Sequence, residues 1–140
     1  MLFIIRKFNK FGFRENMPIK INKIDHIQLT IPKESESIAR KFYTGVLGLT
    51  EIEKPEPLKP SGGVWYSAGD IELHLGVEEN FNPGKKKVHP AFVVEGLNRI
   101  KVQLIQNDIE IKEEIQIPGR KRFSFYDPFG NRIEFMEFEE

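Results

Sequence analysis

Residues 25–31, Asp-His-Ile-Gln-Leu-Thr-Ile, begin a pattern that the chain repeats at residues 88–94, Val-His-Pro-Ala-Phe-Val-Val. Each stretch has a histidine at its second position, His26 or His89, and continues with the β-branched and apolar residues that favour a strand. A proline directly follows His89, which is compatible with the start of a strand. The two stretches predict equivalent strands of two successive modules, and such internal repeats decide a fold.

The two modules also close in the same way. Residues 69–73 read Gly-Asp-Ile-Glu-Leu, and residues 130–135 read Gly-Asn-Arg-Ile-Glu-Phe. The glutamates of these stretches, Glu72 and Glu134, follow their module's histidine at almost the same interval. A chain that places His and Glu at the same two points of two modules is typical of a duplicated scaffold around a shared site.

The segments between these points predict the order βαβββ in each module. Apolar residues at helical spacing follow the opening strand, and short β-rich runs separated by turns follow the helix. We expect an α+β domain whose modules span about 20–80 and 86–138. The predicted elements are strands near 22–31, 49–54, 63–68, 70–77, 88–95, 109–115, 120–126 and 131–138, with helices from about 35 to 47 and from 97 to 107.

Composition limits the partners and the compartment. A length of 140 residues with 39% hydrophobic and 30% charged residues is typical of one globular domain. The formal net charge of zero provides no field that would attract nucleic acid or an anionic membrane. The absence of cysteine excludes disulfides, thiolate metal ligands and cysteine nucleophiles. We expect a cytoplasmic protein that binds neither nucleic acid nor membrane.

Residues 1–16 precede the repeat. Their apolar run at 1–5 is too short to span a membrane, and basic residues follow it rather than precede it, which is the wrong order for a signal peptide. We predict a dispensable extension followed by a single domain at 17–140. A basic amphipathic anchor is the alternative for this segment.

The ordered motifs resemble those of the vicinal-oxygen-chelate superfamily, which includes glyoxalase I, fosfomycin-modifying enzymes, bleomycin-resistance proteins, methylmalonyl-CoA epimerase and extradiol dioxygenases. Each motif is weak by itself, but their order and spacing over roughly residues 20 to 138 are specific for this fold. The residues that carry the resemblance are Asp25-His26-Ile27, Phe42-Tyr43 with Leu47-Gly48-Leu49, Ile71-Glu72-Leu73-His74, His89-Pro90-Ala91-Phe92, and Arg122-Phe123 through Asp127-Pro128-Phe129-Gly130-Asn131-Arg132-Ile133-Glu134.

The resemblance implies a glyoxalase-like fold, in which two βαβββ modules curl their mixed sheets into a cup with the helices outside. It also implies a metal site inside the cup, with ligands from the first and last strand of each module. By position these ligands are His26, His89 and Glu134. Two imidazoles and a carboxylate suit one divalent ion, whether zinc, nickel, manganese or iron.

The fourth ligand has two candidates. The repeat pairs Glu72 with Glu134, which favours Glu72. His74 lies two residues further along the same predicted strand and therefore points to the same face. The repeat places Met136 at the position equivalent to His74, so the histidine has no symmetric counterpart. Either residue could reach the metal, and the other would then act as base or as support.

Three further side chains are candidates for substrate binding. Trp65 would line the cup, with core packing as the alternative, and Arg120 and Arg122 share one face of a predicted strand, with a solvated strand as the alternative. One of these arginines would grip a carboxylate or phosphonate. The catalytic base would be Glu134 or Glu72.

Two functions from different classes follow. The first is a metal-dependent enzyme of the glyoxalase type that binds vicinal oxygens of a small substrate, with isomerase, epimerase, lyase or thiol-transferase chemistry. Ring-cleaving dioxygenation is a less favoured variant, because those enzymes usually have four modules. The second is a metal-free protein, like the bleomycin-resistance branch, that sequesters a small molecule. The resemblance also implies a homodimer, with modules either closed within one chain or swapped between two.

Overall fold

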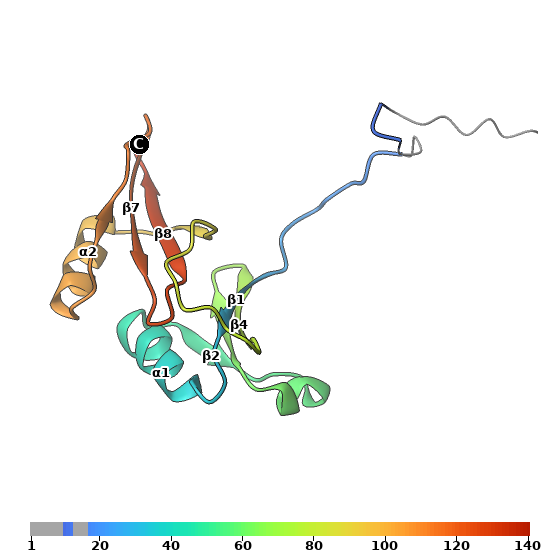
Figure 1. Ribbon diagram of the computed structural model, residues 1–140. Coiled ribbons are helices and arrows are strands. Elements are labelled where there is room, and N and C mark those ends of the chain that lie inside the picture. The colour runs from blue at the N-terminus through green and yellow to red at the C-terminus, as the bar shows by residue number, and fades with distance from the viewer. Residues whose placement is uncertain (1–9, 13–16) are drawn as a thin grey trace, which may run out of the picture.

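The computed structural model describes residues 10–12 and 17–140, and within them the chain forms two βαβββ modules (Figure 1). The α+β fold class predicted from the repeat is confirmed. The first module contains β1 (His26–Ile31), α1 (Glu36–Arg40), the π-helical turn η1 (Lys41–Val46), β2 (Thr50–Ile52), the 3-10 turn η2 (Glu56–Ser61), β3 (Val64–Ala68) and β4 (Ile71–Val77). The second contains β5 (Ala91–Val93), α2 (Leu97–Gln106), β6 (Lys112–Glu113), β7 (Arg120–Tyr126) and β8 (Arg132–Phe138).

Each module folds its strands into one four-stranded mixed sheet. The order is β1-β4-β3-β2 in the first module and β5-β8-β7-β6 in the second. The opening and closing strands pair in parallel, and the remaining pairs are antiparallel. His26 therefore lies beside Glu72, and Ala91 lies beside Glu134. The repeat seen in the sequence thus brings the histidine end of each module next to its glutamate.

Strand alternation divides each sheet into an apolar and a polar face. On β4, Leu73 and Leu75 are buried in the core, whereas Glu72 and His74 project from the opposite face. On β7 and β8, the side chains that point to the apolar face of the second sheet are likewise buried in the core. The fully buried aromatic and aliphatic residues of the core include Ile31, Tyr43, Tyr66, Leu75, Phe125 and, at 1% exposure, Val64, Leu73, Leu104 and Ile133.

The first module packs against the second through its helical segment. α1 and η1 lie between the first sheet and the lower ends of β7 and β8, whereas α2 covers the outer side of the second sheet (Figure 1). Phe42 of η1 contacts Phe125 of β7, with ring centroids 6.3 Å apart. The Tyr43 hydroxyl donates to Asp127 at 2.6 Å, and the Asn131 amide donates to the carbonyl of Thr30 at 2.8 Å. Both polar contacts join the two modules.

The strands and helices lie where the repeat predicts them, with shorter limits at the edges. β5 and β6 occupy only the middle of the predicted strands 88–95 and 109–115. The predicted helix begins at Glu36 but continues from Lys41 as a π-helical turn. The predicted extension 1–16 lies outside the described residues except for residues 10–12.

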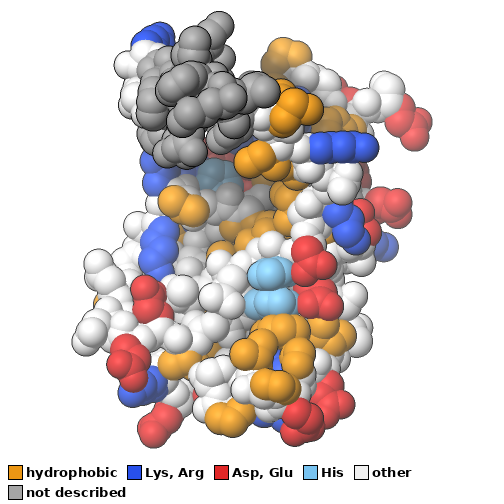
Figure 2. Space-filling model, turned by 90° about the vertical axis from the view of Figure 1, so that its right-hand side faces the viewer, with side chains coloured by type: hydrophobic (Ala, Val, Ile, Leu, Met, Phe, Trp, Pro, Cys, Tyr) orange, Lys and Arg blue, Asp and Glu red, His pale blue; other side chains and the backbone are white. Residues whose placement is uncertain are grey.

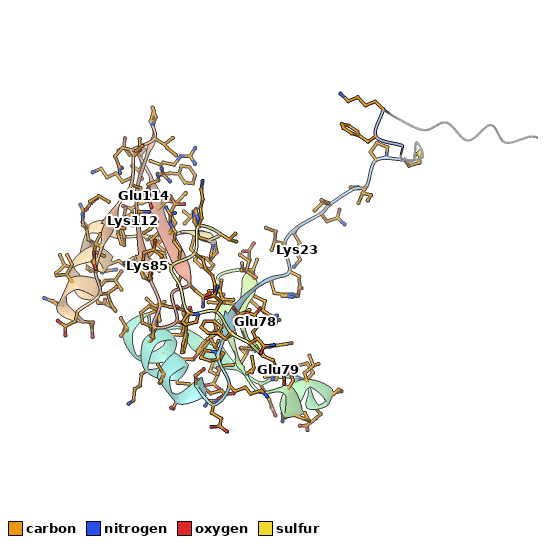
Figure 3. All side chains as sticks on the ribbon, in the orientation of Figure 1. Lys23, Glu78, Glu79, Lys85, Lys112 and Glu114 are labelled. Atoms are coloured by element: carbon orange, nitrogen blue, oxygen red, sulfur yellow. The ribbon has the colours of Figure 1, made fainter. Side chains whose placement is uncertain are left out.

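The N-terminal segment leaves the body of the molecule before β1 begins. Figure 1 shows it running away from both sheets, and Figure 3 places Lys23 on it. Its apolar residues are exposed, at 87% for Met17, 88% for Ile19 and 81% for Ile21. In the part of the chain that the structure describes, no helix has the length and apolar character needed to cross a bilayer.

Candidate functional site

The first module gathers three predicted site residues on the polar face of its sheet. His26 of β1 and His74 of β4 stack their rings with centroids 4.3 Å apart. His74 Nε2 lies 2.7 Å from Oε2 of Glu72. Figure 2 looks onto this side of the molecule and shows histidine side chains beside acidic ones. Both His74 and Glu72 project from this face because they are two residues apart on one strand.

His26 is held by its neighbour in the sequence. Its Nδ1 lies 2.9 Å from Oδ2 of Asp25, which leaves Nε2 as the nitrogen free to bind a ligand. This hydrogen bond is the main reason why the pKa of the Asp25 carboxyl is lowered. Sequence reasoning assigned no role to Asp25, although its position next to His26 was the available signal.

The second module gathers His89, Glu134 and Arg122. His89 Nε2 lies 3.3 Å from Oε2 of Glu134, and the Arg122 guanidinium donates to Oε1 of the same carboxylate at 2.6 Å. Only 5% of the Glu134 side chain is exposed. A buried carboxylate needs such partners, because desolvation otherwise makes its charge costly.

His89 is oriented in the same way as His26. Its Nδ1 lies 2.7 Å from the carbonyl oxygen of Lys87, so the ring presents Nε2 toward Glu134. Metal-binding histidines commonly have the second ring nitrogen tied to a carboxylate or carbonyl, which fixes the tautomer and the ring plane. Both His26 and His89 meet this condition, and the donor set of imidazoles and carboxylates fits a divalent metal.

The structure keeps the two groups of predicted ligands apart. His26, Glu72 and His74 lie together in the first module, whereas His89 and Glu134 lie together in the second. Over residues 10–12 and 17–140 no three His, Asp or Glu side chains converge as they would around one ion. One chain in this arrangement therefore presents two half-sites.

The predicted substrate-binding residues have different surroundings. One face of the Trp65 ring is covered by His74, with ring centroids 3.6 Å apart. Arg122 is engaged by Glu134 and by the carbonyl of Ile115, at 3.0 Å from Nε and 2.8 Å from one terminal nitrogen. Arg120 lies over the Phe138 ring at 5.1 Å, and its buried Nε has no hydrogen-bond partner among the described residues. Of the two arginines, Arg120 is the one left without an acceptor.

Sequence reasoning also missed an ion pair beside the second sheet. Arg132 of β8 binds the carboxylate of Glu114, which Figure 3 shows next to this sheet. Arg132 also approaches the hydroxyl of Ser124 at 3.4 Å. The sequence predicted a strand over 109–115, but β6 ends at Glu113, so the predicted strand did not indicate this partner for Glu114.

Two hollows in the described surface lie away from both half-sites. One of about 720 Å³ is lined by residues such as Pro32, Phe81 and Pro128. The other, of about 520 Å³, lies at the junction of the modules and is lined by residues such as Leu47, Phe92 and Phe135. Neither lining includes a predicted ligand, so the half-sites do not open into either hollow.

Comparison with known proteins assigns a family to this arrangement. The profile of the Glyoxalase/Bleomycin resistance protein/Dioxygenase superfamily matches residues 23–135. A solved structure from Bacillus anthracis, described as a glyoxalase family protein, is 47% identical, with a TM-score of 0.82 over 88% of this chain and 100% of its own. No curated protein matches the chain significantly.

More distant structures share the fold. The fosfomycin resistance protein FosX from Listeria monocytogenes is 16% identical, with a TM-score of 0.67 over 86% of this chain and 96% of its own. Lactoylglutathione lyase from Agrobacterium tumefaciens is 21% identical, with a TM-score of 0.66 over 84% of this chain and 94% of its own. At these identities the likeness concerns the fold and not the reaction.

Proposed function

Because the chain belongs to the Glyoxalase/Bleomycin resistance protein/Dioxygenase superfamily, we propose that it is a metal-dependent enzyme of the glyoxalase type. Its substrate would be a small molecule that presents two neighbouring oxygens, and the reaction an isomerisation, epimerisation, elimination or thiol transfer. The observation that carries the proposal is the matched geometry of the half-sites. In each module a hydrogen bond at Nδ1 fixes a histidine so that its Nε2 is the nitrogen available to a metal, beside a strand that carries a glutamate.

We assign the metal to His26, His89 and Glu134, with Glu72 or His74 as the fourth ligand. Bound there, a divalent ion would act as a Lewis acid that stabilises developing negative charge on a substrate oxygen. Arg122 and His89 hold the buried Glu134 carboxylate in a fixed orientation. The Glu72 side chain is 42% exposed and within the described residues forms one side-chain hydrogen bond, to His74, so it is the more accessible of the two proposed bases.

We further propose that two copies of the chain complete each site. The half-sites lie in different modules, and β1 and β5 each lie at one edge of their sheet. Apolar side chains near these edges are exposed, at 60% for Ile24, 87% for Val88 and 61% for Val93. A homodimer in which the first module of one copy faces the second module of the other would cover such residues and bring the half-sites together.

The test is the metal content of the purified full-length protein. We expect close to one divalent ion per chain in the wild type by elemental analysis, after incubation with zinc, nickel, manganese or iron. A double variant, His26→Ala with Glu134→Ala, should lose this ion because it removes one ligand from each half-site. Glu53→Ala, which removes an exposed glutamate of the first module, serves as the control and should keep it. A wild type that binds none of these ions would rule out the proposal.

One observation favours the metal-free alternative, a protein that sequesters a small molecule. Arg122 already compensates the charge of the buried Glu134 carboxylate at 2.6 Å, so this side chain has a cationic partner without an ion. If the wild type is metal-free after incubation with all four metals, we expect ligand binding without turnover. Screening small molecules by thermal shift would then identify the ligand, because binding stabilises the folded state.

A further inference from the structure

The ring of His74 lies in the middle of a stack of three rings from three strands. Trp65 of β3 covers one face, with centroids 3.6 Å apart and planes inclined by 5°. His26 of β1 covers the other face, at 4.3 Å and 16°. Only 5% of the His74 side chain is exposed. A ring enclosed in this way has little freedom to rotate toward a ligand.

The edge of the same ring is engaged by Glu72. His74 Nε2, the nitrogen at the outer end of the imidazole, lies 2.7 Å from Oε2 of Glu72. His26 and His89 instead tie Nδ1, to Asp25 and to the Lys87 carbonyl, and Nε2 of His89 also lies 3.3 Å from Glu134. Among the three histidines, His74 is the one whose Nδ1 has no hydrogen bond within the described residues, and its Nε2 contact with a carboxylate is shorter than that of His89.

We propose that His74 is a positioning residue and not a metal ligand. It orients the Glu72 carboxylate through Nε2 and sets the plane of the His26 ring by stacking. This inference rests on the proposed metal site and decides between the two candidates for its fourth ligand in favour of Glu72. Without His74, the Glu72 side chain, which is 42% exposed, would sample several rotamers, and His26 would lose one packed face.

The second module supports this role by holding its carboxylate in a different way. Met136 occupies the place equivalent to His74 and cannot donate a hydrogen bond. Arg122 lies opposite Met136 in the strand register, as Trp65 lies opposite His74, and it binds Glu134 at 2.6 Å. Each module thus supplies a cationic or N–H partner for its glutamate. In the first module the partner, His74, lies on the same strand as the glutamate, and in the second the partner, Arg122, lies on the neighbouring strand.

Two variants separate the two contributions of His74. His74→Phe keeps a ring in the stack but removes the hydrogen bond to Glu72, and His74→Gln keeps an N–H donor but removes the ring. We would titrate Co²⁺ into the metal-free full-length proteins and record the visible absorption, which reports the ligand set. Ser67→Ala is the control, because Ser67 lies beside Glu72 on the same face and is exposed.

We expect His74→Phe to weaken Co²⁺ affinity by about 10- to 100-fold, as loss of an outer-shell partner typically does. His74→Gln should recover part of this loss, and both variants should keep the wild-type absorption spectrum. A spectrum altered in both variants would identify His74 as a ligand and overturn the proposal. Unchanged affinity in His74→Phe would overturn it as well.

A second readout needs no metal. Trp65 is the only tryptophan of the chain, and its fluorescence reports on the ring that covers it. In the metal-free protein, His26→Ala should change this fluorescence when His74 is present but not in a His74→Ala background. Absence of that coupling would overturn the positioning role. If the wild type shows the coupling but binds no Co²⁺, the proposed metal-dependent function would be contradicted, whereas the stacking of His74 between Trp65 and His26 would still be supported.

Discussion

Asp127 shows how one residue can join the two modules. Its buried carboxylate accepts hydrogen bonds from the backbone N–H of Phe129 at 2.9 Å and of Asn131 at 2.8 Å, which shape the turn before β8. It also accepts from the Tyr43 hydroxyl at 2.6 Å, across the module junction. Burial raises the pKa of Asp127, and burial beside this carboxylate raises the pKa of Tyr43 well above its ordinary value. The sequence motifs that contain Tyr43 and Asp127 belong to different modules and gave no indication that the two side chains meet.

We predict that Tyr43→Phe destabilises the protein by about 1.5–3 kcal/mol, the usual range for a hydrogen bond to a charged group. The substitution leaves a buried oxygen of Asp127 with one donor fewer, and it keeps the ring in the core. The free energy of unfolding in urea would measure this loss. Tyr126→Phe is the control, because the Tyr126 hydroxyl has no hydrogen-bond partner in the described chain; equal losses in both variants would contradict the prediction.

For individual residues, the sequence predicted the strand face on which a side chain lies better than it predicted the side chain's interaction partner. Two-residue periodicity was enough to place Glu72 and His74 on one face of β4, and the structure confirms this placement. The pairing of Arg122 with Glu134 needs the register between β7 and β8, which depends on the turn at residues 127–130 and on packing. Such partners were therefore not predicted, although the faces were.

Among the strands, the observed first and last residues depend on packing against neighbouring strands more than on the local amino-acid composition. β7 and β8 match their predicted ranges because alternation and turns mark both ends clearly. β5 and β6 are shorter than predicted, since edge strands need few apolar residues and their ends are set by neighbours rather than by their own sequence. The π-helical turn at Lys41–Val46 has no signal in helical periodicity, because a single turn with i→i+5 hydrogen bonds is too short to set a spacing of its own.

Gly63 directly precedes β3, at a point where its backbone lies very close to the backbone of β4. Its φ is +86°, and a Cβ atom there would lie 2.2 Å from the carbonyl oxygen of Leu75. Its N–H donates to the Glu36 carboxylate at 3.0 Å, which joins the start of α1 to this point and is the main reason why the pKa of Glu36 is lowered. Only glycine fits this close approach of two backbones.

We therefore predict that Gly63→Ala costs about 3 kcal/mol or more, because the backbone of β3 or β4 must shift. Gly69→Ala is the matched control: Gly69 also has a positive φ, of +63°, but a Cβ atom there meets nothing within 4 Å. It should cost only about 1 kcal/mol, the penalty of the left-handed conformation. Thermal unfolding of both variants would compare them, and similar midpoints would contradict the role given to Gly63.

For the whole molecule, the repeat predicted two equivalent modules but not how they meet. η1 packs against the second module through Phe42 and Phe125 and through Tyr43 and Asp127, and in this arrangement the two half-sites lie apart within the described chain. Apolar periodicity is the same whether modules close on each other or pair with a second copy. The assembly is therefore the part of the site that sequence patterns leave open.

A mixing experiment tests the swapped dimer directly. If each site takes His26 and Glu72 from one chain and His89 and Glu134 from the other, His26→Ala and Glu134→Ala homodimers each have two defective sites. A mixed dimer has one site with both defects and one intact site. After equal amounts are unfolded and refolded together, about half of the dimers should be mixed, so metal should return to about one quarter of the sites.

Modules that close within one chain would give the opposite result, because every site would then carry one of the two defects and no metal would return. Dilution provides a second measurement with the wild type alone. In a swapped dimer, the apparent metal affinity should fall as the protein is diluted below the dissociation constant of the dimer, since monomers hold only half-sites. A metal affinity that is the same for monomer and dimer, measured together with sedimentation, would show that one chain completes its own site.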